Sequence, residues 1–352
     1  MASSLIPLRT PRQAILPELP DLGDHLADLL RQIPPGRVTT YGALARALGS
    51  IVAARWVATW INDPSGPSGL PRHRVVLQSG ELGRSRNGDE PVQQRLLRAE
   101  GIEVGDRGVD LERCGFDGFQ ATQPLAQLQT AQVALAELVD STPPTLFPEF
   151  VAGVDVSYAG TSGSSPVYGF AAYVLVHIGS GETVWSLTMR RTIRFPYIPG
   201  FLAFREAPIL CALLDEVRSN DRLADVVLVD GNGRLHHRHS GVACHVGVVA
   251  GIPTIGVGKS LLCGTADVRG MRRGESRPVM LHDQIVAHAW QTAARGRPIY
   301  ISAGHRMNLE TALRIVQRVG IAGRIPSPIQ RAHLLSRKVA KCSPSPRHFP
   351  MA

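Results

Sequence analysis

The first hundred residues show the pattern of a small helical unit. Residues 21–33 place apolar side chains at helical spacing and end at Pro34. Thr39 and Thr40 place a threonine to cap a second helix that stops at Gly49, and residues 52–61 predict a third helix after a tight turn. Helix, short turn and helix in this order predict a helix-turn-helix, although any pair of adjacent helices gives the same outline.

From residue 150 onward, short apolar runs rich in β-branched residues predominate and predict buried strands. These runs lie at residues 150–157, 168–177, 182–190, 226–229, 252–258 and 300–302. A Gly-Ser-Gly turn joins the second and third runs, so the first three predict an antiparallel meander. Helical patterns lie between or after them, at residues 127–139, from Glu206 onward, from Gly304 to about Val319, and at 326–340. The pattern predicts an α/β domain with a central mixed sheet, following a small, mainly α domain.

Length and charge support two unequal domains. The chain has 352 residues and a formal net charge of +9, and this length suggests two domains. Residues 1–115 contribute a net charge of only +1, whereas residues 116–352 contribute +8. A basic excess of this kind suits a phosphate-binding surface, so we expect the second domain to bind nucleic acid.

Cysteine usage and the termini indicate a cytoplasmic protein. The chain has 5 cysteines, none of them in a CxxC pair, which fits reduced thiols rather than a disulfide framework. We expect residues 1–20 to be disordered and not a signal peptide, and residues 341–352 to form a disordered tail. No run approaches the ~18 consecutive apolar residues of a membrane span.

Three acids stand where metal chemistry would need them. Asp230 ends the strand at 226–229 and precedes a Gly-Asn-Gly turn, although an aspartate at such a place can also simply begin a turn. Asp155 lies inside an apolar strand, where an isolated carboxylate needs a partner. Glu206 lies near the start of a helical segment. Three carboxylates from separate elements can converge on a hard divalent cation, which polarises a phosphoryl group and activates water.

Five sequence blocks carry a family resemblance. They are GVDVSY around Asp155, PYIPGFLAFRE around Glu206, VLVDGNGRLHHRHSGVACHVG around Asp230, IGVGKSLL around Lys259 and SAGHRMNLETAL around His305. In order and spacing they resemble the endonuclease V family over about residues 120–340. The resemblance implies an RNase H-like fold and nicking of DNA at the second phosphodiester 3′ to deoxyinosine. It also implies Mg²⁺ as cofactor, with Mn²⁺ as a substitute, and 3′-hydroxyl and 5′-phosphate products. His237 departs from the family pattern, which has proline there.

The same resemblance implies roles for individual residues. Asp155, Glu206 and Asp230 would hold the metal. His305, expected beside these acids where a strand meets a helix, would orient the attacking water or transfer a proton. Tyr197 would lie in a wedge that fills the space of the extruded base, and Lys259 would contact the DNA backbone. The positions around the flipped base would be Gly200, Leu202, Gly231 and Gly241. A proline-stiffened loop and a surface histidine are the alternatives for Tyr197 and His305.

The first domain carries a second resemblance. IPPGRVTTYGALARALG, ARWVATWIND, LPRHRVV, GELG and QRLLRAEGIEV resemble the DNA-binding domain of O6-alkylguanine-DNA alkyltransferases over about residues 21–113. Arg72 stands where that family has its nucleophilic cysteine, and alkyl transfer needs a thiolate. The resemblance therefore implies lesion binding without repair. Tyr41 would press on the DNA backbone and Arg55 would enter the duplex, with a half-buried aromatic and a phosphate contact as the alternatives.

These expectations combine into a fusion of a lesion sensor with a nuclease. We expect a disordered segment at 1–20, an alkyltransferase-like domain at 21–113, a linker at 114–126, a nuclease domain at 127–340 and a tail at 341–352. The expected partner is damaged DNA, and we expect a monomer with no membrane association. Two alternatives are an inosine-specific endoribonuclease acting on RNA, and a non-catalytic adaptor that binds damage and recruits other repair proteins. The four candidate catalytic residues argue against the adaptor.

Overall fold

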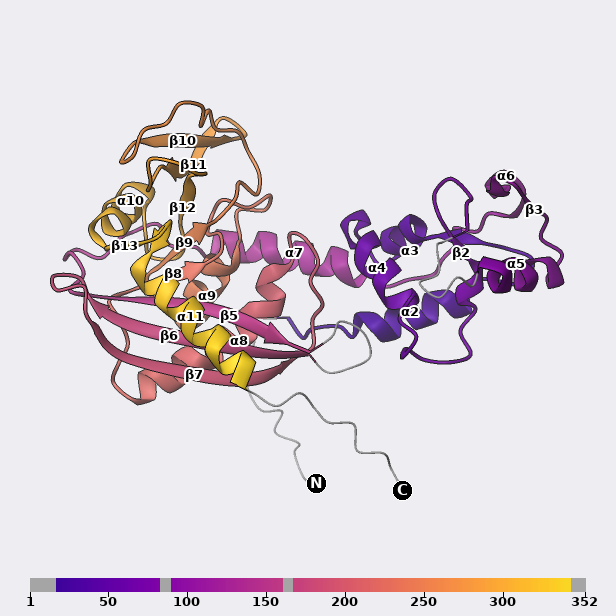
Figure 1. The fold of residues 1–352 in the computed structure, drawn as a ribbon, viewed down its shortest axis with the longest axis horizontal. Helices are drawn as coiled ribbons and strands as arrows, with labels where there is room; N and C mark the ends of the chain where they lie inside the picture. Colours follow the sequence, from indigo (N-terminus) through magenta and orange to yellow (C-terminus); the bar gives the residue numbers. More distant parts are fainter. Residues whose placement is uncertain (1–16, 83–89, 161–166, 343–352) are drawn as a thin grey trace, which may run out of the picture.

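The protein has a small helical domain at one end and a large sheet domain at the other, with helix α7 (Pro124–Glu137) between them (Figure 1). The computed structural model describes residues 17–82, 90–160 and 167–342. Most of the residues expected to be disordered at the two ends lie outside this part of the chain. No helix of the described part is long and apolar enough to cross a lipid bilayer.

The N-terminal domain is built mainly from short helices, as predicted. The helices are α2 (Leu22–Arg31), α3 (Tyr41–Ala47), α4 (Ala54–Ile61), α5 (Glu90–Ala99) and α6 (Leu111–Cys114). Two small strand pairs accompany them, β1 (Thr39–Thr40) with β2 (Val75–Val76) and β3 (Val104–Gly105) with β4 (Gly108–Val109). Asp21 caps α2 by accepting two backbone N–H groups, and Thr40 caps α3 through the N–H of Ala43. Helices α3 and α4 form the predicted helix-turn-helix.

The C-terminal domain contains an eight-stranded mixed sheet. Its strand order is β10-β11-β12-β9-β8-β5-β6-β7. The strands are β5 (Phe150–Ala159), β6 (Val167–His177), β7 (Thr183–Ile193), β8 (Val226–Asp230), β9 (Thr254–Gly258), β10 (Ser276–Leu281), β11 (Gln284–Trp290) and β12 (Ile299–Ala303). Strands β5, β8 and β9 run parallel to one another, and the other neighbours are antiparallel. The predicted meander of β5, β6 and β7 is confirmed.

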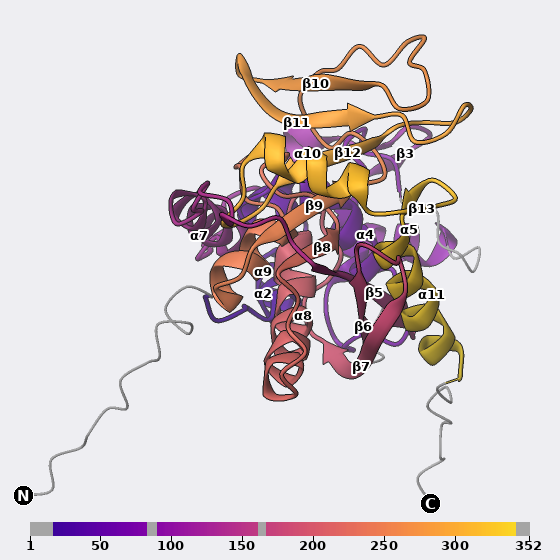
Figure 2. The same ribbon diagram turned by 90° about the vertical axis from the view of Figure 1, so that its left-hand side faces the viewer.

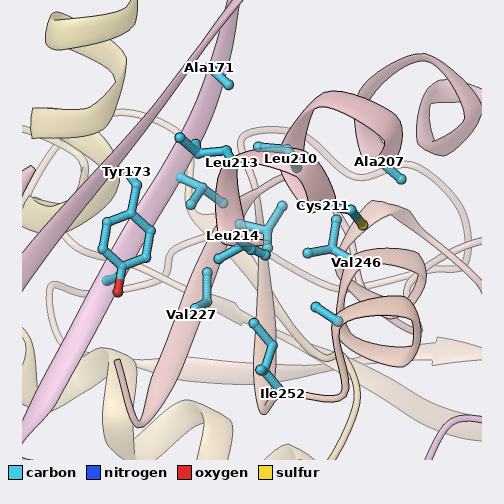
Figure 3. Packing of buried hydrophobic residues seen from close by; sticks show 14 of the residues in the cluster. Ala171, Tyr173, Ala207, Leu210, Cys211, Leu213, Leu214, Val227, Val246 and Ile252 are labelled. Atoms are coloured by element: carbon cyan, nitrogen blue, oxygen red, sulfur yellow. The ribbon is translucent and has the colours of Figure 1, made fainter. Parts of the chain in front are cut away.

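Helices cover both faces of this sheet. Ala152 and Val154 of β5 pack against α8 (Leu202–Ser219) and α9 (Val242–Ala250) on one face, in the core drawn in Figure 3. The preceding residue, Val151, packs toward the opposite face, which α10 (Leu309–Arg318) and α11 (Ser327–Cys342) cover. Figure 2 shows α8 and α11 on opposite sides of β5 and β6. The alternation of side chains along each strand thus provides a core on each face.

Some elements differ from their predicted bounds. Helix α10 begins at Leu309 and not at Gly304, because Asn308 adopts an extended conformation and caps the helix through the N–H of Thr311. Helix α7 begins at Pro124, three residues earlier than predicted. The hairpin of β10 and β11 and the short strand pair β13 (Ile321–Ala322) and β14 (Ile325–Pro326) were not predicted. Polar residues within the hairpin interrupt the apolar run that would have marked it.

One hydrophobic cluster joins the two domains. Leu125 and Leu128 of α7 and four residues of the C-terminal domain pack with the buried side chains of α2, α3 and α4. Those four residues are Phe195, Ile198, Phe201 and Phe204. The N–H of Leu125 also donates to the carbonyl of Leu48 over 2.8 Å. Within the segment expected as a linker, Phe116 and Phe119 pack against the same cluster, so this segment lies against the domains and does not span open space.

We predict that Leu125→Ala lowers the free energy of unfolding of the whole chain by about 2–5 kcal/mol, because a fully buried leucine is removed from the shared core. Urea denaturation followed by circular dichroism measures the change. Leu146→Ala is the matched control, since that side chain is 82% exposed. Equal stability of the two variants would contradict a core shared by both domains.

Candidate active site

Asp155 and Asp230 lie side by side on neighbouring parallel strands. Val154 of β5 is in register with Val229 of β8, so the two aspartates occupy the next positions along each strand. Both side chains project toward the face that carries α11, on which Val151 and Leu228 also lie. Asp155 is buried, and Asp230 is half-buried at the strand end. The sheet register alone therefore brings these two predicted acids together.

Helix α11 closes over the two aspartates at short range. A side chain at Gly153 would overlap the backbone of Pro328 and Ile329, so glycine permits the start of α11 to touch β5. Two turns further along, Ser336 Oγ donates to Asp155 Oδ2 over 2.6 Å. His333 Nδ1 lies 3.3 Å from the same oxygen. His333 is therefore a site residue that the sequence reasoning missed.

Glu206 reaches the site from the opposite face. It lies in the second turn of α8, is only 8% exposed, and accepts a hydrogen bond from the Tyr158 hydroxyl over 2.8 Å. The Arg205 guanidinium stacks 4.3 Å from the centre of the Tyr158 ring and so holds this tyrosine from the other side. A hydroxyl group therefore contacts Asp155 and another contacts Glu206, and the Arg205 cation contacts the tyrosine that binds Glu206.

Burial and mutual repulsion disfavour negative charge here. Burial, together with the smaller effect of the nearby Asp230 and Asp155, raises the pKa of Glu206 to about 8, and the hydrogen bond from Tyr158 opposes this shift. Burial and Asp155 raise the pKa of Asp230 to about 7, although the ammonium of Lys259, which pairs with Asp230, opposes the shift. A site whose carboxylates resist ionisation in this way gains from an added cation.

The donor set fits a divalent metal ion. Asp155, Asp230 and His333 can each offer one ligand atom, and these atoms lie within 4.8 Å of one another. Carboxylate oxygens are the preferred ligands of Mg²⁺ and Mn²⁺. Glu206 interacts electrostatically with both aspartates and can complete the set. Asp155 and Asp230 of the expected metal site therefore lie within reach of one ion, with His333 beside them, whereas Glu206 is not one of the three residues whose atoms lie this close together.

His305 does not lie beside these acids, and its expected placement was wrong. It follows β12, whose Ala303 pairs with Ile255 near the start of β9, whereas Asp230 pairs with Val257 near the end of that strand. Its ring Nδ1 accepts the backbone N–H of Asp140 over 3.2 Å. Its charged neighbours are Arg306 and Asp140. Strands β8 and β9 are parallel, and β12 is antiparallel to them. The chain therefore reaches His305 at the end of these strands that is opposite to Asp230.

The loop before α8 presents Tyr197 to solvent. Tyr197 is 64% exposed, whereas Phe195 and Ile198 on either side are buried in the core between the domains. The carbonyl of Gly200 accepts hydrogen bonds from Gln132, His236 and Arg238. The loop is therefore fixed at both ends around a projecting aromatic ring, and Leu202 stands half-buried at the first position of α8.

The other predicted substrate residues lie along the chain that follows β8. A side chain at Gly241 would overlap the carbonyl of Asn232, and one at Gly231 would overlap Val242, so this loop packs too tightly for larger residues. Burial lowers the pKa of His236 to about 4, which leaves its ring neutral at physiological pH. Lys259 pairs with Asp230 and is 41% exposed, close enough to the acids to meet a phosphate bound there.

In the N-terminal domain, the three predicted lesion-sensing residues have different surroundings. Arg55 is exposed on α4, and Tyr41 is half-buried at the start of α3. Arg72 is held by its own domain, because its guanidinium donates to the carbonyls of Ile61, Asp63 and Pro67. It also stacks over the Trp60 ring at 5.6 Å. Arg72 thus closes the loop after α4, and Arg55 is the more accessible of the two arginines.

Comparisons with known proteins match both parts of the chain. A family model described as Endonuclease V matches residues 131–334. A second, described as the DNA-binding domain of 6-O-methylguanine DNA methyltransferase, matches residues 22–102. A protein of Picrophilus torridus named bifunctional methyltransferase/endonuclease is 33% identical over 303 residues, which are 85% of this chain and 91% of that protein.

Solved structures resemble the C-terminal domain. The catalytic domain of human endonuclease V is 33% identical and superposes with a TM-score of 0.57, covering 63% of this chain and 98% of the human one. Ciona intestinalis endonuclease V, solved with a DNA that contains an inosine followed by a ribo-adenosine, is 27% identical with a TM-score of 0.55. It covers 62% of this chain and 98% of its own.

The pKa shifts predict how stability depends on pH. The folded-state pKa of Glu206, about 8, lies above the ordinary value of 4.5, so the folded state binds more protons between these values. Metal-free protein should therefore lose stability as pH rises from about 4.5 to 8, by about 1.4 kcal/mol for each pKa unit at most.

Calorimetry in EDTA at several pH values measures this loss. Addition of Mg²⁺ should raise the unfolding temperature more at pH 8 than at pH 5. Glu206→Gln should flatten the pH dependence, whereas Glu216→Gln, an exposed position on the same helix, should leave it unchanged. A Glu206→Gln protein with the same pH profile as the unmodified chain would remove Glu206 from the acid cluster.

Proposed function

The chain belongs to the endonuclease V family, and from this membership we propose that it nicks DNA at the second phosphodiester 3′ to deoxyinosine in a metal-dependent reaction. It is a DNA-repair nuclease of that family joined to an alkyltransferase-like DNA-binding domain. The observation that carries the proposal is the convergence of Asp155, Asp230 and His333 at one edge of the sheet, with Glu206 beside them. Such a cluster serves hydrolysis of a phosphodiester and has no evident use in a binding adaptor.

The proposed reaction needs no covalent intermediate on the protein. Mg²⁺ or Mn²⁺ held by Asp155, Asp230 and Glu206 would polarise the scissile phosphate and supply an activated water. Ser336 keeps Asp155 oriented by donating to one of its oxygens. Lys259 offers a positive charge beside Asp230 that can pair with a phosphate oxygen. Tyr158 holds Glu206 so that the carboxylate faces the two aspartates.

We assign the proton-transfer role to His333 in place of His305. His333 lies against Asp155 with its side chain 29% exposed, so it can exchange a proton with solvent beside the scissile bond. His305 accepts a hydrogen bond from the backbone N–H of Asp140 at the other end of these strands. Its role there is to pack the chain around β9.

Recognition of the deaminated base falls to the loops around Tyr197. The exposed Tyr197 is placed to occupy the space that a flipped base leaves, and Gly200, Leu202, Gly231 and Gly241 would surround that base. Support comes from the Ciona intestinalis relative, whose bound DNA contains an inosine. The ribo-adenosine in the same DNA favours a second candidate, cleavage of inosine-containing RNA.

The N-terminal domain is proposed to bind O6-alkylguanine DNA reversibly. Arg72 occupies the position of the nucleophile, and all of its hydrogen bonds named above go to backbone carbonyls. A guanidinium cannot accept an alkyl group in the way a thiolate does. Tyr41 and Arg55 would then serve binding alone.

The nuclease assignment predicts a loss of chemistry without a loss of binding. With Mg²⁺, the chain should nick a deoxyinosine duplex at the second phosphodiester 3′ to the lesion, faster than matched inosine RNA. Asp155→Ala and Asp230→Ala should abolish nicking yet still bind the duplex, because phosphate contacts supply most of the affinity. Glu310→Ala, an exposed acid on α10, is the control that should nick normally. Normal nicking by either aspartate variant would end the assignment of this metal site.

The sensor assignment predicts binding without transfer. A duplex with O6-methylguanine labelled on its methyl group should bind the full chain and be recovered intact, with no label on the protein. Filter binding followed by gel analysis of the protein measures both. Label on the protein, with or without binding, would show that another residue replaces the missing cysteine.

A further inference from the structure

A groove lies between the two domains, with walls from both. Its volume is about 640 Å³, within the range of roughly 300–1,000 Å³ that holds organic ligands. Helix α4 lines one side, and the segment from Ile193 to Pro199 with the first turns of α8 lines the other. The side chains that matter to the argument are Arg55, Trp56 and Trp60 from α4, and Arg194, Tyr197 and Arg205 from the nuclease domain.

The lining suits a nucleic-acid strand. Arg55, Arg194 and Tyr197 are exposed, so guanidinium groups and an aromatic ring are free to meet a ligand. Asp21, the acid in the lining, is engaged in capping α2. Proteins that bind unpaired strands combine aromatic stacking surfaces with positive charge along the backbone. The exposed Arg55, Arg194 and Tyr197, from two domains, provide that combination, and the half-buried Trp56, Trp60 and Arg205 line the groove beside them.

The groove is linked to the acid cluster by two side-chain contacts. Arg205, in its wall, precedes Glu206 on α8 and stacks on Tyr158. The Tyr158 hydroxyl in turn donates to Glu206. A strand whose phosphate lies at the acids can therefore extend toward the groove, and no second DNA molecule is needed to fill it.

The hydrophobic core that the two domains share holds the two walls of the groove relative to each other. Phe195 and Ile198, next to Tyr197, are buried against the helices of the N-terminal domain. The N–H of Leu125 bonds to Leu48, and Gln129 donates to Ser50. These contacts set α4 opposite the Tyr197 loop in one fixed arrangement.

We propose that this groove is a composite nucleic-acid site, in which unpaired nucleotides of the strand being cut lie between α4 and the Tyr197 loop. The N-terminal domain then takes part in recognising deoxyinosine DNA that carries no alkylated base. The proposal rests on the proposed nuclease function for the identity of the strand, but not for the binding itself.

The test is equilibrium binding of a fluorescent deoxyinosine duplex without alkylation, measured by anisotropy in EDTA so that cleavage plays no part. Arg55→Ala and Arg194→Ala should each weaken binding about fivefold or more, and each should reduce the salt dependence by about one ion. Arg113→Ala is the matched control, an arginine of the N-terminal domain with a side chain 77% exposed, outside the groove. It should bind like the unmodified chain.

A double-mutant cycle separates one composite site from two independent ones. In Arg55→Ala combined with Tyr197→Ala, the loss of affinity should differ from the product of the single losses, because residues that share a ligand couple. Multiplicative losses would overturn the composite site, as would equal binding by the Arg55 and Arg113 variants. Nicking in Mg²⁺ is assayed separately. A chain that fails to nick but binds through Arg55 and Tyr197 would end the proposed function and keep the groove.

Discussion

The repulsion among three neighbouring carboxylates, two of them buried, is the constraint around which the nuclease domain is organised. Asp155 and Asp230 meet because β5 and β8 are parallel and in register, and Glu206 arrives from a helix on the other face. Burial and proximity raise the pKa of both Glu206 and Asp230, so the folded chain holds a site that favours protons or a cation. Contacts from Ser336, Tyr158 and Lys259 offset part of the free-energy cost of holding these carboxyl groups close together. The proposed metal site and the stability of the fold therefore depend on the same few atoms.

The second organising feature is the core that both domains share. An alkyltransferase-like domain joined by a free tether would only raise the local concentration of the nuclease. Here α7 and the Phe195–Phe204 segment bury apolar surface against α2, α3 and α4, so the domains are packed as a unit. The loop that presents Tyr197 rests on the N-terminal domain.

Two arginines of the N-terminal domain, Arg72 and Arg55, differ in their surroundings. Arg72 donates to three backbone carbonyls and is part of the fold, whereas Arg55 is exposed beside the nuclease. Replacement of a nucleophile by Arg72 thus gives a domain that keeps a DNA-binding surface and has a different residue at its reactive position. Together with the proposed groove, this arrangement is the basis of our proposal that the domain serves recognition for the nuclease.

The amino-acid sequence by itself determined the strands of the meander, the capped helices of the first domain, and the three acids, because hydrophobic period, caps and strand ends are local properties. The family resemblance predicted that Asp155, Glu206 and Asp230 converge. The register of β5 with β8 brings the two aspartates together. Only the tertiary structure showed that His333 lies beside Asp155 and that His305 lies beside Asp140. The pattern of residues 326–340 predicts a helix, but which of its side chains meets Asp155 depends on the close approach of α11 at Gly153. The place of His305 depends on the antiparallel direction of β12, and the groove depends on a core assembled from segments more than 100 residues apart in the chain. These contacts join residues that are far apart in the sequence, so the local pattern of apolar and polar residues does not predict them.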